Sequence, residues 1–313
     1  MTTVSHPPPR VADAPAARGD TDDTAPGGAT ARGARRLRLG VIGHVEHVTF
    51  GRVPALPGPG DIVHLDEPFW IPGGGGGVTF FQLLRSPGEI VLFTAIGTDS
   101  GGDAIGARLA ATPAAIHAVR RPREHTRDLV LLTPDGERTI MVIGKPLQPE
   151  RADPLPWDDL GGCDAVYFTA QDPALFAVAR AARLLVVSAR RRAALVRSGV
   201  RADVVVGSAK DPREASRLAD YSMPPRAVVM TEGGAGGRIE TATGVERFDA
   251  APAPTPRVAA YGAGDSFVGA LTWYLACGLD LPVACARASL HGAAVLRGLN
   301  ALESQLPLEW PAD

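Results

Sequence analysis

The chain has 313 residues, of which 32 are basic and 34 acidic, so its formal net charge is -2 with neutral histidines. This balance argues against a nucleic acid or an anionic membrane surface as the main partner. Hydrophobic residues make up 45% and charged residues 21%, as in globular proteins with a large core. No run approaches the roughly 18 consecutive apolar residues that cross a bilayer, and the N-terminus lacks the apolar segment of a secretory signal. We therefore expect a soluble, cytoplasmic protein.

The three cysteines, Cys163, Cys277 and Cys285, are few, odd in number and not spaced as CxxC or Cys/His metal ligands. Such usage is typical of a reducing compartment. We expect reduced thiols, most of them buried.

Residues 1–35 differ in composition from the rest of the chain. Ala, Pro, Gly, Asp and Arg dominate them, and neither helical nor strand periodicity is present. Such a segment cannot bury enough apolar surface to fold, so we predict a disordered tail. A transit peptide is the alternative, but Asp13, Asp20, Asp22 and Asp23 make the segment more acidic than such peptides normally are.

From residue 36 to residue 313, short apolar runs alternate with stretches of helical periodicity. The predicted strands are 37–42, 90–96, 165–168, 184–188, 204–206 and 227–231. The predicted helices include 102–111, 173–182, 189–198 and 212–219. Strands that alternate with helices indicate βαβ units, so we predict one three-layer α/β domain whose mostly parallel central sheet is covered on both faces.

Two segments interrupt this alternation. Residues 53–72 carry five prolines and an isolated apolar run at 62–65 that we interpret as a strand. Residues 126–143 are predicted to form a hairpin around the turn at Pro134, Asp135 and Gly136. Neither segment fits a crossover between parallel strands. We therefore interpret residues of about 46–72 and 126–143 as a small β extension that forms a lid over the strand ends.

The strongest motif is Gly262-Ala263-Gly264-Asp265, directly before a helix whose apolar face runs to a stop at Gly278. Free backbone N–H groups and the positive end of the helix dipole make such a turn a phosphate site. Asp265 is placed there as a candidate general base. A glycine turn in which Asp265 merely caps the helix explains the same four residues equally well.

Two further glycine-rich segments are candidate ligand sites. Five glycines at 73–77 precede an apolar helical stretch, but the pattern is a poor match to a dinucleotide fingerprint, and the chain contains no Walker P-loop. Residues 228–237 run from a strand into a glycine loop, at the kind of strand end where open α/β sheets bind ligands. An ordinary hairpin explains this second segment at least as well.

Taken in order, these motifs resemble the ribokinase-like (PfkB) family of carbohydrate kinases over about residues 37–307. The Gly262–Asp265 motif is similar to the family's C-terminal signature, which implies that Asp265 is the catalytic base and that Gly262, Ala263 and Gly264 form an anion hole. The glycines at 73–77, followed by Gly97-Thr98-Asp99, resemble the N-terminal signature, and residues 127–129 with 138–140 resemble the lid hairpin.

The resemblance also implies a nucleotide site and a substrate site. It assigns ATP contacts to Thr231, Gly233 and Gly236, in a loop similar to the family's nucleotide loop. It also assigns them to Ser208 and Asp211, in the segment that corresponds to the family's Asn-x-x-Glu. Asp211 is the nearest candidate carboxylate for Mg²⁺, held through water. Substrate contacts are expected from Glu46, Gly74, Gly75 and Asp172.

Several positions depart from the family pattern. Gly75 replaces the usual Lys of the N-terminal signature, and Val78 replaces its sugar-contacting Asn. Near the first strand, Glu46 and Val48 replace the usual Asn and Asp. The sugar pocket is therefore not that of a ribokinase.

The resemblance implies an ATP-dependent kinase that phosphorylates a hydroxyl of a sugar or related small molecule. A nucleoside kinase is the enzymatic alternative, and a catalytically weak sugar-binding regulator is the alternative from another class. Asp265 argues against the regulator, because a pure binder has no use for a base. We expect no nucleic-acid or membrane partner, and we predict a homodimer that forms through the lid.

Two clusters of charged or titratable side chains remain. His44, Glu46 and His47 follow the first strand but lack a complete set of metal ligands, so contact of Glu46 or His44 with substrate is favoured. The run Arg190-Arg191-Arg192 is interpreted as the solvated start of a helix.

Overall fold

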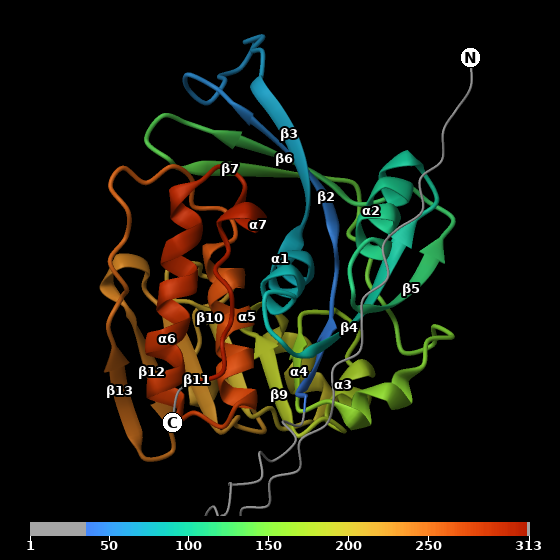
Figure 1. The fold of residues 1–313 in the computed structure, drawn as a ribbon, viewed down its shortest axis with the longest axis vertical. Coiled ribbons are helices and arrows are strands. Elements are labelled where there is room, and N and C mark those ends of the chain that lie inside the picture. The colour runs from blue at the N-terminus through green and yellow to red at the C-terminus, as the bar shows by residue number, and fades with distance from the viewer. Residues whose placement is uncertain (1–35, 312–313) are drawn as a thin grey trace, which may run out of the picture. The chain divides into compact units, whose positions relative to one another are not determined.

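The computed structural model describes residues 36–311, so the tail predicted at 1–35 lies outside the described residues. In the described part, strands and helices alternate around a central sheet, and a second, smaller sheet lies at one end of it (Figure 1). The three-layer α/β fold with a β lid, predicted from the sequence, is confirmed.

The central sheet of the described part has nine strands. In spatial order they are β13 (Gly244–Phe248), β12 (Gly237–Thr241), β11 (Ala227–Thr231), β10 (Val204–Ser208), β9 (Leu184–Ser188), β8 (Ala165–Phe168), β1 (Arg38–Ile42), β4 (Glu89–Gly97) and β5 (Ala115–Arg121). All neighbours from β5 to β11 are parallel, whereas β12 and β13 pair antiparallel at one edge. Burial on both faces explains why the parallel strands are continuous apolar runs.

Alternate side chains of each strand enter different cores. Leu39 and Val41 of β1 pack into one apolar cluster, whereas Ile42 packs into the other. The first cluster contains residues of α1 (Gly74–Leu83), α2 (Ser100–Ala110), α5 (Ala263–Ala276) and α6 (Leu281–Ala294). The second contains residues of α3 (Leu175–Ala179), α4 (Arg192–Ser198) and the 3-10 turn η1 (Trp157–Gly162). Helices therefore cover both faces of the sheet.

The small sheet forms the lid. Its strands, in the order β3 (Asp66–Gly73), β2 (Glu46–Arg52), β6 (Arg127–Leu132) and β7 (Arg138–Ile143), are antiparallel except for the parallel pair β2–β6. We call the face that carries Glu46, Val48, Phe50, Asp128 and Val130 the inner face. Val48, Phe50 and Val130 pack there in a third apolar cluster with Val78, Tyr261 and Leu302. The opposite, outer face carries His47, Thr49, Trp70, Leu129, Met141 and Ile143.

The remaining short helical turns lie in loops or near the C-terminus. They are η2 (Ala189–Arg191), η3 (Leu218–Asp220), η4 (Gly233–Ala235), η5 (Val295–Arg297) and α7 (Ala301–Ser304). Residues of η5 and α7 contribute to the third apolar cluster, so the C-terminal segment helps to hold the lid.

The apolar runs that were predicted as strands are confirmed, as is the hairpin of β6 and β7. The strand predicted at 62–65 is wrong, because β3 begins only at Asp66. Pro68 and Pro72 are accommodated in β3 because it is an edge strand, where missing N–H donors cost little.

The helix predicted at 212–219 is also wrong, and the one at 173–182 is limited to α3. After β10, Glu214 accepts a hydrogen bond from the backbone N–H of Ser208 (2.9 Å), and Asp211 accepts one from that of Arg213 (2.9 Å). Such bonds between side chains and nearby backbone compete with helix formation. The chain therefore forms a sequence of turns that keeps both carboxylates near the end of β10.

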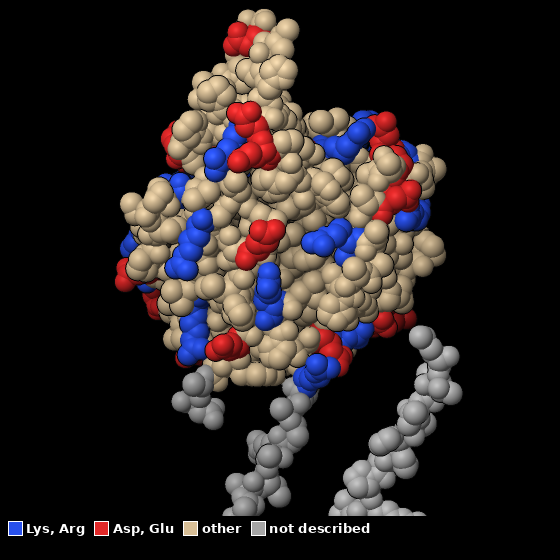
Figure 2. Space-filling view, turned by 45° about the horizontal axis from the view of Figure 1, so that its top comes forward, with Lys and Arg blue, Asp and Glu red and all other residues tan. Residues whose placement is uncertain are grey.

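Basic and acidic side chains are interspersed over the face seen in Figure 2, without a large patch of one sign. This distribution agrees with the near-zero net charge. None of the helices within residues 36–311 has the length and apolar character to span a membrane. Cys163 and Cys285 are buried and Cys277 is partly buried, and all three are free thiols.

Candidate active site

Helix α5 begins directly at the glycine turn. Gly262 is its N-cap, with φ of 79°, a left-handed conformation that favours glycine. A Cβ atom at Gly264 would meet no other atom within 4 Å, so the space in front of the first turn is open. The N–H groups of Ala263, Gly264 and Asp265 have no partner within the helix, because they belong to its first turn. The turn can therefore receive an anion at the positive end of the helix dipole.

Asp265 lies at the junction of α5 and α1. Thr79 Oγ1 of α1 donates a hydrogen bond to the backbone oxygen of Asp265 (3.2 Å). A Cβ atom at Gly75 would lie 3.4 Å from Asp265 Oδ1 and 3.6 Å from Thr169 Oγ1, beyond the end of β8. A side chain at position 75 would therefore start beside the candidate base, and Gly75 leaves that space free.

The surroundings of Asp265 make it a weaker acid than usual. Loss of hydration, followed by the negative charge of Glu214, raises its pKa to about 6, although Arg138 and Arg190 act in the opposite direction. A carboxyl group with this pKa is mostly ionised at neutral pH and is basic enough to accept a proton from a hydroxyl group during reaction.

The glycine run at 73–77 is mostly helix. Gly74 to Gly77 form the first turn of α1, and two of their backbone N–H groups are held by side chains. Gly74 N–H donates to Tyr261 Oη (2.9 Å), and Gly75 N–H donates to His44 Nε2 (3.2 Å). Glycine is required because a Cβ at Gly76 would collide with the backbone of residue 44. The run thus brings the start of α1 against the ends of β1 and β2.

Glu46 forms a buried pair with a residue that the sequence analysis did not select. Glu46 is 8% exposed and Asp128, on the neighbouring lid strand, is 4% exposed. Burial, and then the charge of Asp128 and a hydrogen bond with it, raises the pKa of Glu46 to about 9; burial also raises the pKa of Asp128. Asp128 was missed because its proximity to Glu46 depends on the parallel register of β2 and β6.

His44 lies beside Glu46, with 3.7 Å between His44 Nε2 and Glu46 Oε1. Burial, together with the positive charges of Arg191 and Arg190, lowers the pKa of His44 to about 3. The imidazole is therefore neutral at physiological pH, and Nε2 serves as acceptor for the N–H of Gly75.

The solvated role predicted for the arginine run is wrong for Arg191, which is partly buried, whereas Arg190 is exposed. Arg191 Nε donates to the backbone oxygen of Thr169 (2.7 Å), which holds its positive charge near His44 and Glu46. Arg190 bridges Asp211 and Glu214, each at 2.6 Å. The ends of β9 and β10 place these residues together, a proximity that the spacing of the run along the chain does not reveal.

The predicted nucleotide residues gather at the ends of β10 and β11. Ser208 and Thr231 are paired in the parallel register, so they lie side by side. Gly233 and Gly236 both have positive φ in the turn that joins β11 to β12, and a Cβ at Gly233 would lie 2.9 Å from Lys210 Nζ. The segment is thus a hairpin, as the alternative interpretation held, and it also borders the strand ends near Asp211.

The carboxylate predicted to assist Mg²⁺ is already paired. Asp211 contacts Arg190 (2.6 Å) and Arg213 (3.3 Å). Burial acts to raise the pKa of Asp211, but the backbone N–H of Arg213 and then the guanidinium groups of Arg213 and Arg190 lower it. Over residues 36–311 there is no group of three or more His, Cys, Asp or Glu side chains that could hold a metal ion.

Asp172 has a local structural role. Its two carboxylate oxygens accept hydrogen bonds from the backbone N–H groups of Arg151 (2.7 Å) and Ala174 (2.9 Å). It borders a surface depression with Gln171 and Gln148, rather than the pair formed by Glu46 and Asp128.

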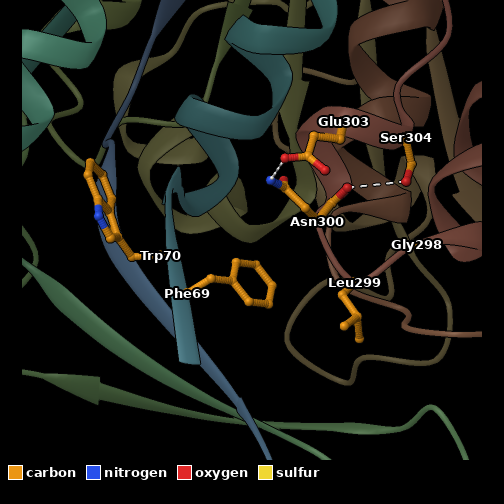
Figure 3. A pocket seen from close by; sticks show the side chains of 7 residues that line it. All are labelled: Phe69, Trp70, Gly298, Leu299, Asn300, Glu303 and Ser304. Carbon is orange, nitrogen blue, oxygen red and sulfur yellow. Dashed lines mark hydrogen bonds between the residues drawn. The ribbon is translucent and has the colours of Figure 1, made fainter. Parts of the chain in front are cut away.

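A cavity of about 420 Å³ lies between β3 and the C-terminal segment (Figure 3). Phe69 and Trp70 line it on one side, and residues 298–300, Glu303 and Ser304 line it on the other. Asn300 is hydrogen-bonded to Glu303 (2.8 Å) and Ser304 (3.2 Å) there. None of the predicted site residues lines this cavity, so it is separate from the glycine turn.

Residues 201–307, which include the glycine turn and the candidate nucleotide loop, match the model of the pfkB family of carbohydrate kinases. The whole described fold is similar to solved kinase structures. A ribokinase from Thermotoga maritima is 16% identical with a TM-score of 0.69, and the match covers 87% of this chain and 96% of the other. The protein has a ribokinase-like fold. The resemblance inferred from the sequence is confirmed.

Other ribokinase-like structures match to a similar extent. Arabidopsis thaliana ribokinase, solved with ribose and ATP, is 15% identical with a TM-score of 0.67 over 87% of this chain and 96% of the other. Adenosine kinase from Sinorhizobium meliloti is 17% identical with a TM-score of 0.68 over 86% and 98%. A comparison with curated protein sequences gives no significant match.

The structure explains why residue 78 is a valine. Its side chain is fully buried in the third apolar cluster, and a Cβ at Gly262 would lie 3.2 Å from it. Val78 therefore packs against the glycine turn, in place of the amide expected at this position.

Proposed function

We propose that the protein is an ATP-dependent kinase that phosphorylates a hydroxyl group of a sugar or related small molecule. The observation that carries this proposal is the position of Asp265, in the first turn of α5, beside the open space at Gly264 and next to Gly75. A hydroxyl group in that space is within reach of a base and of free backbone N–H groups at once.

In the proposed reaction, Asp265 accepts the proton of the substrate hydroxyl as its oxygen attacks the γ-phosphorus of ATP. The bond from that phosphorus to the bridging oxygen of ADP breaks, and ADP leaves. The N–H groups of Ala263, Gly264 and Asp265, with Gly262 shaping the turn, stabilise the charge on the transferring group. Mg²⁺ would neutralise phosphate charge when it arrives with ATP.

The nucleotide is proposed to lie along the ends of β10 and β11. Ser208, Thr231, Gly233 and Gly236 border this edge of the sheet, and strand ends of this kind are the usual ligand sites of open α/β folds. The substrate is proposed to lie over Gly74 and Gly75, between Asp265 and Glu46, because atoms of both acids lie close to these two glycines.

The test is release of ADP from ATP and magnesium across a panel of sugars, sugar acids, polyols and nucleosides. We expect Asp265→Asn to reduce turnover about 100- to 10,000-fold, since a general base contributes that much, while ATP binding and folding persist. Asp103→Asn is the matched control, because Asp103 is exposed on α2 and pairs only with Arg120. An Asp265→Asn variant with an unchanged rate would contradict the assignment.

A nucleoside is the second candidate substrate because the lid has apolar side chains beside the acids. Ile140 and Val142 lie on the inner face in register with Val130 and Asp128, and they are 41% and 54% exposed. Such a surface could cover the nucleobase of a nucleoside. Nucleosides that release ADP faster than sugars would favour this candidate.

We further propose a homodimer through the outer face of the lid. Trp70, Met141 and Ile143 are 38%, 42% and 50% exposed there, and β7 is an edge strand with unpaired backbone groups. Burial of this face against a second copy would remove both features from water.

A further inference from the structure

The inner face of the lid holds two carboxyl groups that are removed from water. Glu46 and Asp128 come from the neighbouring parallel strands β2 and β6. Val48 is paired with Asp128, and Glu46 precedes Val48 by two residues on β2, so the side chains of Glu46 and Asp128 lie on the same face. The two groups share a hydrogen bond. The bond favours a protonated form of the pair, so the two carboxyl groups share one proton.

One oxygen of this pair has no partner. Asp128 Oδ1 is fully buried and makes no hydrogen bond within residues 36–311, and no salt bridge involving Asp128 forms in this part of the chain. A buried carboxylate oxygen without a donor is costly. Its presence therefore points to a ligand that supplies donors at this position.

The groups around the pair do not neutralise it. His44 is neutral and uses Nε2 as an acceptor for Gly75. Asp265 adds a further negative charge near Glu46, and the charge of Arg191 acts in the opposite direction. The site as a whole therefore favours a positive charge near Asp128.

The pair and the candidate base border the same two residues. A Cβ at Gly74 would lie 2.8 Å from Glu46 Oε2, and a Cβ at the next residue, Gly75, would lie 3.4 Å from Asp265 Oδ1. Consecutive Cα atoms are about 3.8 Å apart, so a molecule the size of a monosaccharide over these glycines reaches both acids.

We propose that the substrate carries a primary ammonium group, bound between Glu46 and Asp128 while its hydroxyl group faces Asp265. This inference rests on the proposed kinase function and names its substrate class, an amino sugar or amino polyol. An ammonium group has three N–H donors and no acceptor, and an ionised carboxylate has acceptors and no donor, so the two groups are complementary. When the ammonium binds, the proton shared by Glu46 and Asp128 leaves to solvent, and the cation takes its place.

The experiment compares matched compounds on the full chain. Each set has a primary amine, a hydroxyl or an acetamide at the same carbon of an otherwise identical sugar or polyol. Isothermal titration calorimetry at pH 7.5, in two buffers with different heats of ionisation, gives both the affinity and the number of protons released. We expect the best amine to bind at least about tenfold more tightly than its hydroxyl and acetamide partners, with release of about one proton from the acid pair.

Variants locate the effect. Asp128→Asn and Glu46→Gln keep the shape of each side chain and should each reduce the preference for amine over hydroxyl about tenfold. Thermal unfolding checks that the variants fold. Proton release by the wild-type chain is independent of any variant, so the proposal stays testable even if one of them is unstable.

The outcomes separate this proposal from the kinase function. Hydroxyl compounds that bind as tightly as the amines, without proton release, would overturn the ammonium proposal, and ADP formation from them would leave the kinase function standing. If no amine in the panel binds more tightly than its partners, the proposal also falls. Absence of ADP with every compound, despite ATP binding, would instead contradict the kinase function.

Discussion

Under the proposed function, protonation of Asp265 and turnover are linked. Because burial raises its pKa to about 6 from an ordinary value of 3.8, the ionised base is lost as the pH falls through about 6. We expect kcat/KM to be level above this pH and to fall about tenfold per pH unit below it. Initial rates between pH 5 and 8 measure this limb. A decrease in kcat/KM that begins only near pH 4, as for an exposed carboxylate, would contradict the buried environment of Asp265.

Glu46 should make the stability of the unliganded protein depend on pH. Its pKa rises from an ordinary 4.5 to about 9, so between these values the folded state binds more protons than the unfolded state. Stability therefore decreases as the pH rises through this window. We expect the wild-type melting temperature to fall more between pH 6 and pH 9 than that of Glu46→Gln. Equal changes in the two proteins would show that Glu46 is not the group responsible.

At the scale of elements, the start of α1 depends on one hydroxyl group. Tyr261 Oη accepts a hydrogen bond from the buried N–H of Gly74, and Tyr261→Phe leaves that donor without a partner. We expect a loss of about 1–3 kcal/mol in the free energy of unfolding, together with reduced activity, because Gly74 and Gly75 lie between the two acids. Denaturant unfolding and ADP release measure the two effects.

Tyr274→Phe is the matched control for this prediction. Tyr274 is also buried and shares a hydrogen bond with His291 (3.1 Å), but it lies further along α5. Removal of the Tyr274 hydroxyl group should reduce the free energy of unfolding, while activity is retained at temperatures where the variant stays folded. Equal loss of activity in both variants would mean that Tyr261 acts only through general stability.

The elements differ in how far the sequence predicts them. Buried parallel strands such as β1 and β8 are predicted well, because burial on both faces leaves a continuous apolar run. The segment at 212–219 has helical periodicity, but Asp211 and Glu214 bond nearby backbone groups and prevent a helix. Leu65 belongs to a predicted strand but instead packs over Gly51 of the lid. Local pattern fails where a tertiary contact or a side-chain hydrogen bond decides the conformation.

The residues of the candidate site also differ in how well the sequence predicts them. The glycine turn and Asp265 are visible in the sequence because they are contiguous and mark the start of a helix. Asp128 and Arg191 are not, because each reaches the site only through strand pairing or a contact between loops. Asp172 was expected in the substrate site from the family resemblance, yet backbone N–H groups occupy both of its carboxylate oxygens.

At the scale of the whole molecule, the outer face of the lid predicts the oligomeric state. We expect the wild-type protein to be a dimer in size-exclusion chromatography with light scattering, and Met141→Glu with Ile143→Glu to give a monomer, since two buried charges would be costly at the interface. Leu290→Glu is the control, because Leu290 is exposed on α6. An unchanged mass for the double variant would exclude the lid from the interface.

The missing side chain at Gly75 has a consequence for selective chemical probes. A ligand with a substituent that fills the space beside Asp265 would fit this chain, whereas a kinase with lysine at that position would reject it by steric overlap. Such a compound would report on this protein in a mixture of proteins of the same fold, and Gly75→Lys would supply the resistant form that proves its target.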